Sequence, residues 1–515
     1  MATRTENTAK NIVWGYVGNI VSLLVQFASR TIFIYTLGVS FLGINGLFTS
    51  VLGMLSLTEL GIGTAINYSL YKPVAEDDTE KIKSLILLYK KAYQIIALIV
   101  TVIGFVILPF LPFLIKEASD IPNVSLYYVI FLFNTVSSYF VSYKYGLVNA
   151  EQKGYIINNL NSVFNIIITV GQSIILLLFH NYLAYLVTQA FLQLVQKISI
   201  GIFLNKKYPY LQEKAENLAP DEKQKIKKNV GALVLHKIGE ISIYQTDNII
   251  ISAFISVILV GKISNYNLII TSVTSFITII FNSVTASMGN LIATSDSKRQ
   301  VEVFDIYNFL GFWLYGFASV CYWVLFTPFI TLWIGVGNII DEISLALLIL
   351  SQYLTGQRLT VNNVKVAGGI FQQDKYVSLI QGGVNLVISL VLGWLIGLPG
   401  IYIGTVVSGL IANIIKPIIV YKHMYQMSAK RYFLKFCIYI SVTMITAFLL
   451  RWILSPIVSQ LTWIRFFVMA VICAVAVNCI FALVFFKSKE LQGIISRLKN
   501  ILQKRNFFKK NGGNQ

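Results

Sequence analysis

Apolar stretches long enough to cross a membrane recur along almost the whole chain. An α-helix needs about 20 apolar residues to span about 30 Å of hydrocarbon. Only 12% of the 515 residues are charged, against about 25% in ordinary soluble proteins. We therefore predict an all-α polytopic membrane protein with about 14 transmembrane helices. The expected spans are 12–37, 43–68, 85–113, 124–148, 156–179, 182–204, 230–255, 262–288, 304–327, 340–364, 376–397, 399–421, 434–454 and 463–486.

Basic residues are concentrated in alternate loops of this map. These loops, together with both ends of the chain, hold most of the forty-one Lys and Arg residues, whereas the opposite loops hold only Lys116 and Lys262. Such a bias is typical of the positive-inside rule and predicts that both termini are cytoplasmic. The net charge of +19 is therefore explained by topology and contact with membrane lipids, and no nucleic-acid partner is expected.

The sequence also contains a weak internal duplication. Pro109 recurs as Pro328 and Lys197 recurs as Lys416, and the number of positions between the two members is the same in both pairs. Six helices per copy is an even number, so we predict two parallel six-helix repeats rather than inverted ones. The expected parts are an N-lobe at 1–204, a cytoplasmic linker at 205–229, a C-lobe at 230–425, an additional C-terminal helix pair at 426–486 and a basic cytoplasmic tail at 487–515.

Polar residues inside the spans form stripes. In the first span, Gln26 and Arg30 lie on one helical face, and Asn165 of the fifth span recurs as Asn385 of the eleventh. For an isolated Asn or Ser, hydrogen bonding between packed helices is the simpler interpretation. Several such faces in both halves favour a polar path between the lobes.

Buried cations strengthen this hypothesis. A charge at a helix centre costs about 2.5–3.5 kcal/mol on an insertion scale, so several together favour a hydrated cavity. We predict that Arg30 meets cargo in such a cavity, with Arg358, Lys197 and Lys416 nearer the cytoplasmic side. For Lys197 and Lys416, extension of the ammonium group to the interface is an equal alternative. The candidate substrate-binding residues are Arg30, Arg358, Lys197, Lys416, Gln26, Asn165 and Asn385.

Three acidic residues are candidates for ion coupling. They are Glu59, Glu240 and Asp247. Glu240 follows Lys237 by three positions, which predicts a local ion pair, whereas Asp247 is predicted either to couple H⁺ or Na⁺ or to pair with Arg30. The three His and four Cys residues match no metal-ligand spacing, so no cofactor and no metal are expected.

Two segments resemble a known family. The run from Arg30 to Phe48 and the segment from Leu55 to Ile66 are similar to the N-terminal region of polysaccharide-repeat flippases. The segment from Thr246 to Ile251 is similar to the start of the second half of these proteins. These flippases belong to the multidrug, oligosaccharidyl-lipid and polysaccharide (MOP) exporter superfamily. The resemblance implies two lobes around a cavity that opens alternately, in a bacterial cell membrane. It also implies that Arg30 meets the diphosphate of an undecaprenyl-linked oligosaccharide moved from the inner to the outer leaflet.

The resemblance leaves alternatives open. Fourteen spans are closer to the lipid II flippase, in which the extra helix pair helps to form a groove for the polyprenyl tail. A cation-coupled multidrug exporter of the same superfamily is a second alternative. An enzyme is not expected, because the outer loops are short and no Asp-x-Asp motif occurs. Polysaccharide assembly proteins are compatible partners.

Overall fold

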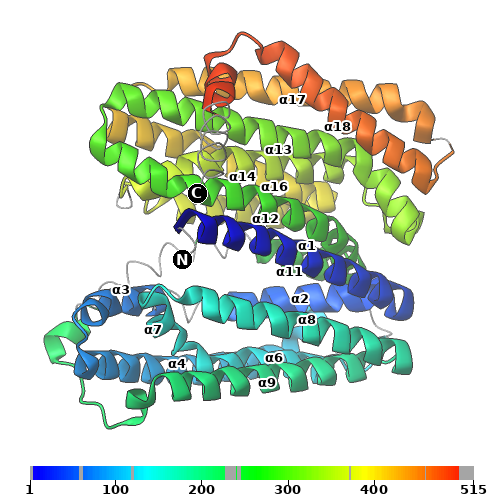
Figure 1. The fold of residues 1–515 in the computed structure, drawn as a ribbon. Helices are drawn as coiled ribbons and strands as arrows, with labels where there is room; N and C mark the ends of the chain where they lie inside the picture. The colour runs from blue at the N-terminus through cyan, green and yellow to red at the C-terminus, as the bar shows by residue number, and fades with distance from the viewer. Residues whose placement is uncertain are drawn as a thin grey trace, which may run out of the picture. The chain divides into compact units, whose positions relative to one another are not determined.

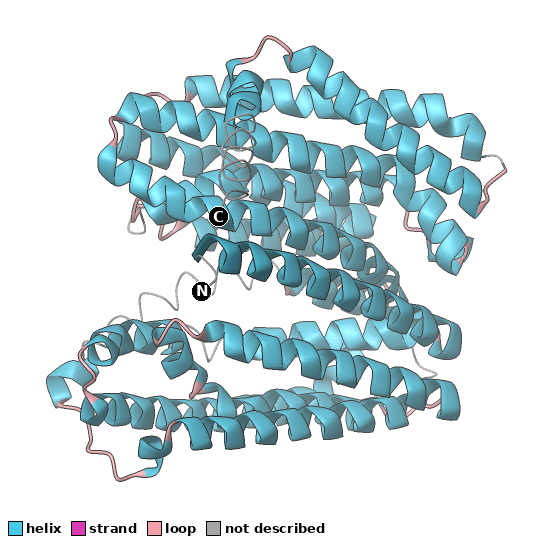
Figure 2. Cartoon of the chain, viewed as in Figure 1, coloured by secondary structure: helices cyan, strands magenta, loops and turns pink. Residues whose placement is uncertain are grey.

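The computed structural model is helical throughout its described part. It describes residues 4–56, 62–117, 121–224, 245–370, 373–458 and 460–497, with the single positions 226 and 239. No strand occurs in these ranges (Figure 2). The chain divides into two compact units, Met1–Asn265 and Tyr266–Gln515, and each is described by itself. The prediction of an all-α polytopic fold is confirmed.

The first unit is built from long helices joined by short turns. In chain order they are α1 (Arg4–Leu37), α2 (Val39–Leu55), α3 (Ile62–Ala75), α4 (Thr79–Ile107), η2 (Leu108–Phe110), α5 (Leu111–Leu114), α6 (Val124–Ser142), α7 (Tyr145–Ala150), α8 (Gly154–Phe179), α9 (Tyr182–Lys207), η3 (Pro209–Gln212), α11 (Thr246–Ile250) and the π-helical turn η4 (Ile251–Ile255). Helix α9 packs against both α6 and α8, and α8 also packs against α1 (Figure 1).

The second unit continues in the same manner. Helix α12 (Val257–Thr294) begins in the first unit and ends in the second. It is followed by α13 (Ser297–Ile334), η5 (Val336–Asn338), α14 (Glu342–Ala367), α15 (Val377–Ile396), α16 (Leu398–Val420), the π-helical turn η6 (Tyr421–Tyr425), α17 (Lys430–Val458) and α18 (Trp463–Phe485). Helix α16 packs against α14 and α15, and α13 packs against α14, α17 and α18.

Short polar side chains set the starts of several helices. The carboxylates of Asp78, Asp296 and Asp341 each accept a hydrogen bond from the backbone N–H three residues later, at the starts of α4, α13 and α14. Asn181 and Thr462 do the same for α9 and α18. Each cap satisfies one of the N–H groups that a first helical turn leaves without an internal partner.

Eleven described helices are long and apolar enough to cross a membrane. The chain is therefore a multi-pass membrane protein. The other three expected spans also fall on helices. Span 340–364 is α14, which carries Glu342, Arg358 and Lys365 and is less apolar. Span 43–68 divides into α2 and α3, and the described end of span 230–255 is α11 with η4.

The start of α12 packs closely against the start of α2 through two glycines. A Cβ atom on Gly43 would lie 1.9 Å from the carbonyl oxygen of Val257, and one on Gly261 would lie 2.2 Å from that of Val39. Only glycine allows two backbones to approach so closely. The preceding segment also joins this packing, since Asn248 of α11 donates to the hydroxyl of Ser50 at 3.0 Å.

The two compact units and the predicted lobes divide the chain at different places. The boundary between the units falls after Asn265, within α12, whereas the duplication places the division at 205–229. Compact units reflect contacts in one conformation and a duplication reflects sequence, so the predicted domain boundaries stay a prediction. The two prolines also differ in setting, because Pro109 lies in the turn η2 after α4 and Pro328 lies inside the continuous α13.

Candidate functional site

Arg30 lies near the end of α1 and is half-buried. Its guanidinium donates a hydrogen bond of 2.9 Å to the hydroxyl of Ser264 on α12. A guanidinium has five N–H donors, and no carboxylate pairs with Arg30 among the residues that the structure describes. The alternative ion pair with Asp247 is not formed. Arg30 therefore keeps donors and charge available for an anion.

Aromatic side chains gather beside Arg30. Tyr185 of α9 interacts electrostatically with Arg30. The Tyr185 ring lies 5.1 Å from that of Phe33, and 6.2 Å from the parallel ring of Tyr182. The hydroxyl of Tyr182 donates to the side chain of Asn45 at 2.7 Å. Rings of this kind present flat apolar faces with polar edges, and Tyr185 is the member of the group that interacts with Arg30.

Two of the other site residues predicted in the first unit, Gln26 and Asn165, are exposed. Gln26 precedes Arg30 by four positions on α1, and Asn165 lies on α8. The backbone carbonyl of Asn165 accepts a hydrogen bond of 2.7 Å from the hydroxyl of Thr169. Exposure leaves both amides able to contact a polar ligand.

Lys197 of α9 contacts α6. Its half-buried ammonium donates to the carbonyl of Asn134 at 2.7 Å and to the hydroxyl of Ser137 at 2.8 Å. Lys416 of α16 is buried and donates to Asn362 of α14 at 3.3 Å. By the predicted duplication, α6 and α14 are corresponding helices. Each lysine thus donates to the corresponding helix of its own half, although the acceptor groups differ.

The predicted polar residues of the second unit either belong to α16 or contact it. Arg358 of α14 is buried and donates to the carbonyl of Gly409 at 3.2 Å. Asn385 of α15 is also buried, and its amide contacts the hydroxyl of Thr405 at 3.3 Å. Arg358 and Lys416 therefore share one helix pair, and Asn385 lies on the neighbouring pair.

Only one of the predicted coupling acids lies in the described part. Asp247 is half-buried in the first turn of α11. Glu59, Glu240 and Lys237 fall outside the described residues. In the part that is described, no cluster of three His, Cys, Asp or Glu residues is arranged to hold a metal ion.

The second unit contains an apolar cavity of about 150 Å³. It lies between α13, α14 and α17. Its lining includes Trp323, Leu350, Tyr353, Met444 and Phe448. Apolar walls of this kind fit a hydrocarbon chain and offer little to a charged group.

Arg30 was predicted from the sequence as a site residue, but its neighbours were not. Ser264 is 234 positions away, and no local pattern links them. Tyr182 and Tyr185 do carry a signal, because a spacing of three positions places both rings on one face of a helix. Aromatic residues are common in membrane helices, so this spacing alone was not selective.

Comparisons with solved structures give the fold. The inward closed conformation of the lipid II flippase MurJ matches with a TM-score of 0.62 and 15% identity, covering 92% of this chain and 99% of that chain. The chain therefore shares the helical fold of this flippase. An inward-facing multidrug resistance MATE transporter of the MOP superfamily matches with a TM-score of 0.58 and 14% identity, covering 77% of this chain and 92% of that chain.

A third match is a mutant of the Vibrio cholerae MATE transporter VcmN, with a TM-score of 0.53 and 15% identity, covering 82% of this chain and 99% of that chain. No family model matches the chain. The search of curated proteins also gives no match. At identities near 15%, these likenesses describe the fold, and cargo must be argued from the residues.

Proposed function

We propose that this protein is a flippase for a lipid-linked oligosaccharide. The cargo is an oligosaccharide joined through a diphosphate to a polyprenyl chain, undecaprenyl in bacteria. The protein moves it from the inner to the outer leaflet of the bacterial cell membrane, with both termini cytoplasmic. Surface polysaccharide assembly proteins would use the product. The observation that carries this proposal is the arginine on α1, which pairs with a hydroxyl instead of a carboxylate.

The chemistry of Arg30 supports a phosphate-bearing cargo. A diphosphate offers several acceptor oxygens, and a guanidinium binds such groups through paired hydrogen bonds. Tyr182 and Tyr185 lie within reach of the same region. Their rings and hydroxyls suit sugar rings, which have apolar faces and polar edges. One site can then hold both the diphosphate and the first sugars.

The remaining predicted residues would attract the headgroup, contact the sugars or couple transport to an ion. Arg358, Lys197 and Lys416 would attract the headgroup from the cytoplasmic leaflet, although each also hydrogen-bonds within its own unit. Gln26, Asn165 and Asn385 would contact sugar hydroxyls. Asp247 would couple transport to H⁺ or Na⁺, together with Glu59 and Glu240.

The apolar cavity between α13, α14 and α17 supports a lipid cargo. Trp323, Leu350 and Phe448 line it, and α17 is the first helix of the predicted additional pair. Part of an isoprenoid chain would lie against this surface while the headgroup crosses. The lipid II flippase fold, which matches 92% of this chain, is compatible with such a cargo.

The alternative is a cation-coupled multidrug exporter, which the MATE-like folds support. Such a protein exports cationic or apolar compounds and favours acidic cavity residues, whereas α1 has no acid near Arg30.

Transport by the purified protein in liposomes separates the two. One set of liposomes would contain a fluorescent polyprenyl-diphosphate oligosaccharide, and the other set a fluorescent cationic drug. Each set would be measured with and without H⁺ or Na⁺ gradients. We expect movement of the lipid-linked sugar alone. Transport of the drug without movement of the lipid would contradict the proposal.

A further inference from the structure

A polar cavity of about 530 Å³ lies at one end of the first unit. It is enclosed by α4, the turn after α6, the end of α9 and the segment that follows α9. Four lysines line it, namely Lys83 and Lys90 two turns apart on α4, Lys144 in the turn after α6 and Lys214 in the segment after α9. The cavity is separate from the aromatic residues around Arg30.

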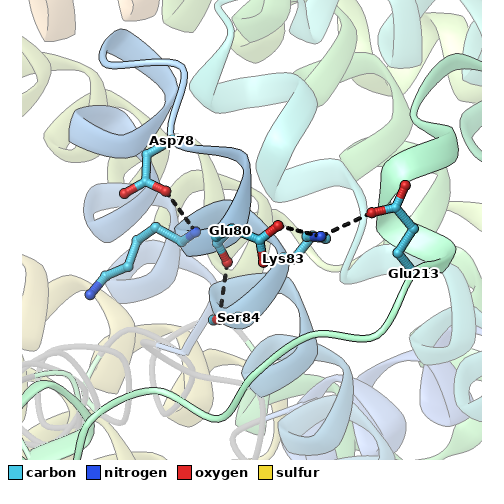
Figure 3. Close-up of polar contacts among 6 residues, drawn as sticks. Asp78, Glu80, Lys83, Ser84 and Glu213 are labelled. Carbon is cyan, nitrogen blue, oxygen red and sulfur yellow. Dashed lines mark hydrogen bonds and ion pairs between the residues drawn. The ribbon is translucent and has the colours of Figure 1, made fainter.

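The cationic charge of this cavity is only partly neutralised. Lys83 is buried and pairs with Glu80 at 2.7 Å and with Glu213 at 2.9 Å (Figure 3). Glu213 is the acidic residue of the lining. Among the described residues, no carboxylate pairs with Lys90, Lys144 or Lys214. Three positive charges therefore face the same space without a counterion from the described part of the protein.

Lys144 shows the electrostatic consequence. Its ammonium donates to the side-chain oxygen of Asn205. Burial, with the nearby charge of Lys90, lowers the pKa of Lys144. Like charges near each other disfavour the charged forms of both groups, and an anion between them reverses that effect.

We propose that this cavity binds a phosphate group. Lysine ammonium groups act as point charges for phosphate oxygens, and Asn205 and Tyr143 add polar groups to the lining. The volume exceeds the roughly 30 Å³ that one water occupies in the liquid many times over, so it has room for a phosphate with some of its water. The phosphate comes either from free phosphate or from the headgroup of an anionic lipid at the membrane surface.

Binding here would fasten the segment after α9 to the helices. Glu213 already attaches that segment to α4 through Lys83. Tyr208 attaches it to the turn after α7 by donating to Glu151 at 2.8 Å. A phosphate bridging Lys90 and Lys144 to Lys214 adds a third attachment. The segment belongs to the predicted linker between the lobes, so its docking would respond to phosphate.

The test uses the full-length protein in nanodiscs of phosphatidylcholine, with inorganic phosphate as the probe. Binding is measured by titration calorimetry, and amide hydrogen exchange is followed over residues 208–217. We expect saturable binding and slower exchange in this segment. Lys144→Gln and Lys90→Gln should each weaken binding about tenfold, a loss of about 1.4 kcal/mol, because each removes one charged donor to the phosphate. Lys72→Gln is the matched control, since Lys72 is exposed on α3 and outside the cavity.

Nanodiscs containing phosphatidylglycerol separate the two sources. If a lipid headgroup is the ligand, phosphatidylglycerol slows exchange by itself and weakens the binding of inorganic phosphate. If free phosphate is the ligand, phosphatidylglycerol has neither effect. The proposal is overturned if neither probe changes exchange in the segment, or if Lys144→Gln and Lys90→Gln bind inorganic phosphate as Lys72→Gln does.

Discussion

The guanidinium of Arg30 on α1 and the hydroxyl of Ser264 on α12 form a hydrogen bond of 2.9 Å. The partner is a neutral side chain, so the positive charge of Arg30 is not cancelled by it. The same hydroxyl donates to the carbonyl of Gly261 at 2.7 Å. Ser264 therefore orients the arginine without competing for its charge.

Ser264→Ala should have a mild effect on transport. The substitution removes one hydrogen bond to Arg30, worth about 1.5–3 kcal/mol at most, but it leaves the charge and frees one more N–H donor for cargo. We expect the initial rate of flipping in liposomes to stay within about threefold of the wild type. A loss as large as that of Arg30→Ala would mean that the serine itself is essential and would contradict this role.

Gly43→Ala should destabilise the packing of α2 against α12. Its Cβ atom would lie 1.9 Å from the carbonyl oxygen of Val257, so the two backbones must separate. Overpacking of this kind costs about 1–3 kcal/mol. We expect a lower midpoint of thermal unfolding in detergent, and the same for Gly261→Ala.

Gly383→Ala is the matched control for these variants. Gly383 lies inside α15, and a Cβ atom there would meet nothing within 4 Å. Alanine favours a helix over glycine by about 1 kcal/mol, so this midpoint should stay or rise. Equal midpoints for Gly43→Ala and Gly383→Ala would show that the close approach is not maintained in the membrane protein.

Acid should weaken the contact between the helical segment 489–497 and α17. Glu490 pairs with Lys435 at 2.6 Å, and Lys435 also pairs with the buried Asp305 of α13 at 2.7 Å. Burial by itself would raise the pKa of Glu490, but hydrogen bonding and charge from Lys435 outweigh it and hold the pKa below its ordinary value. A depressed pKa stabilises the folded state above the ordinary glutamate pKa, and this stabilisation is lost as the pH falls through the folded value.

Thermal unfolding between about pH 6 and about pH 3 measures this effect. The midpoint of the wild type should fall over the acidic part of the range. Glu490→Gln should have a lower midpoint near pH 6 and a smaller fall. An identical pH profile for the two proteins would exclude this ion pair as a source of stability.

Hydropathy predicted where the long helices lie along the chain, but it did not predict where each helix begins. The expected spans 376–397 and 399–421 agree closely with α15 and α16. Two helices begin before the expected spans that start at 12 and 85, since α1 begins at Arg4 and α4 at Thr79. Helices continue beyond the hydrocarbon where polar side chains meet water, and Asp78 rather than hydropathy sets the start of α4.

The site was predicted only in part, because its contacts join distant positions. Arg30 stood out as a charge within an apolar span, which is a local signal. Its partner Ser264 and the pair formed by Lys83 and Glu213 depend on tertiary packing. The basic charge was assigned to topology alone, and the arrangement of Lys83, Lys144 and Lys214 around one cavity required the structure.

The most direct test of the proposed flippase is the rate at which Arg30 variants move a fluorescent polyprenyl-diphosphate oligosaccharide across liposome membranes. Arg30→Ala should lower the initial rate about 10- to 100-fold, as expected for the loss of about 1.5–3 kcal/mol of charged hydrogen bonding, and Arg30→Lys should retain an intermediate rate. The control is Arg465→Ala, since Arg465 lies at the start of α18, away from Tyr182 and Tyr185 in the sequence and in the other unit, and donates to the backbone of Gln460 at 3.1 Å. A folded Arg30→Ala protein that moves this lipid as fast as Arg465→Ala would contradict the account.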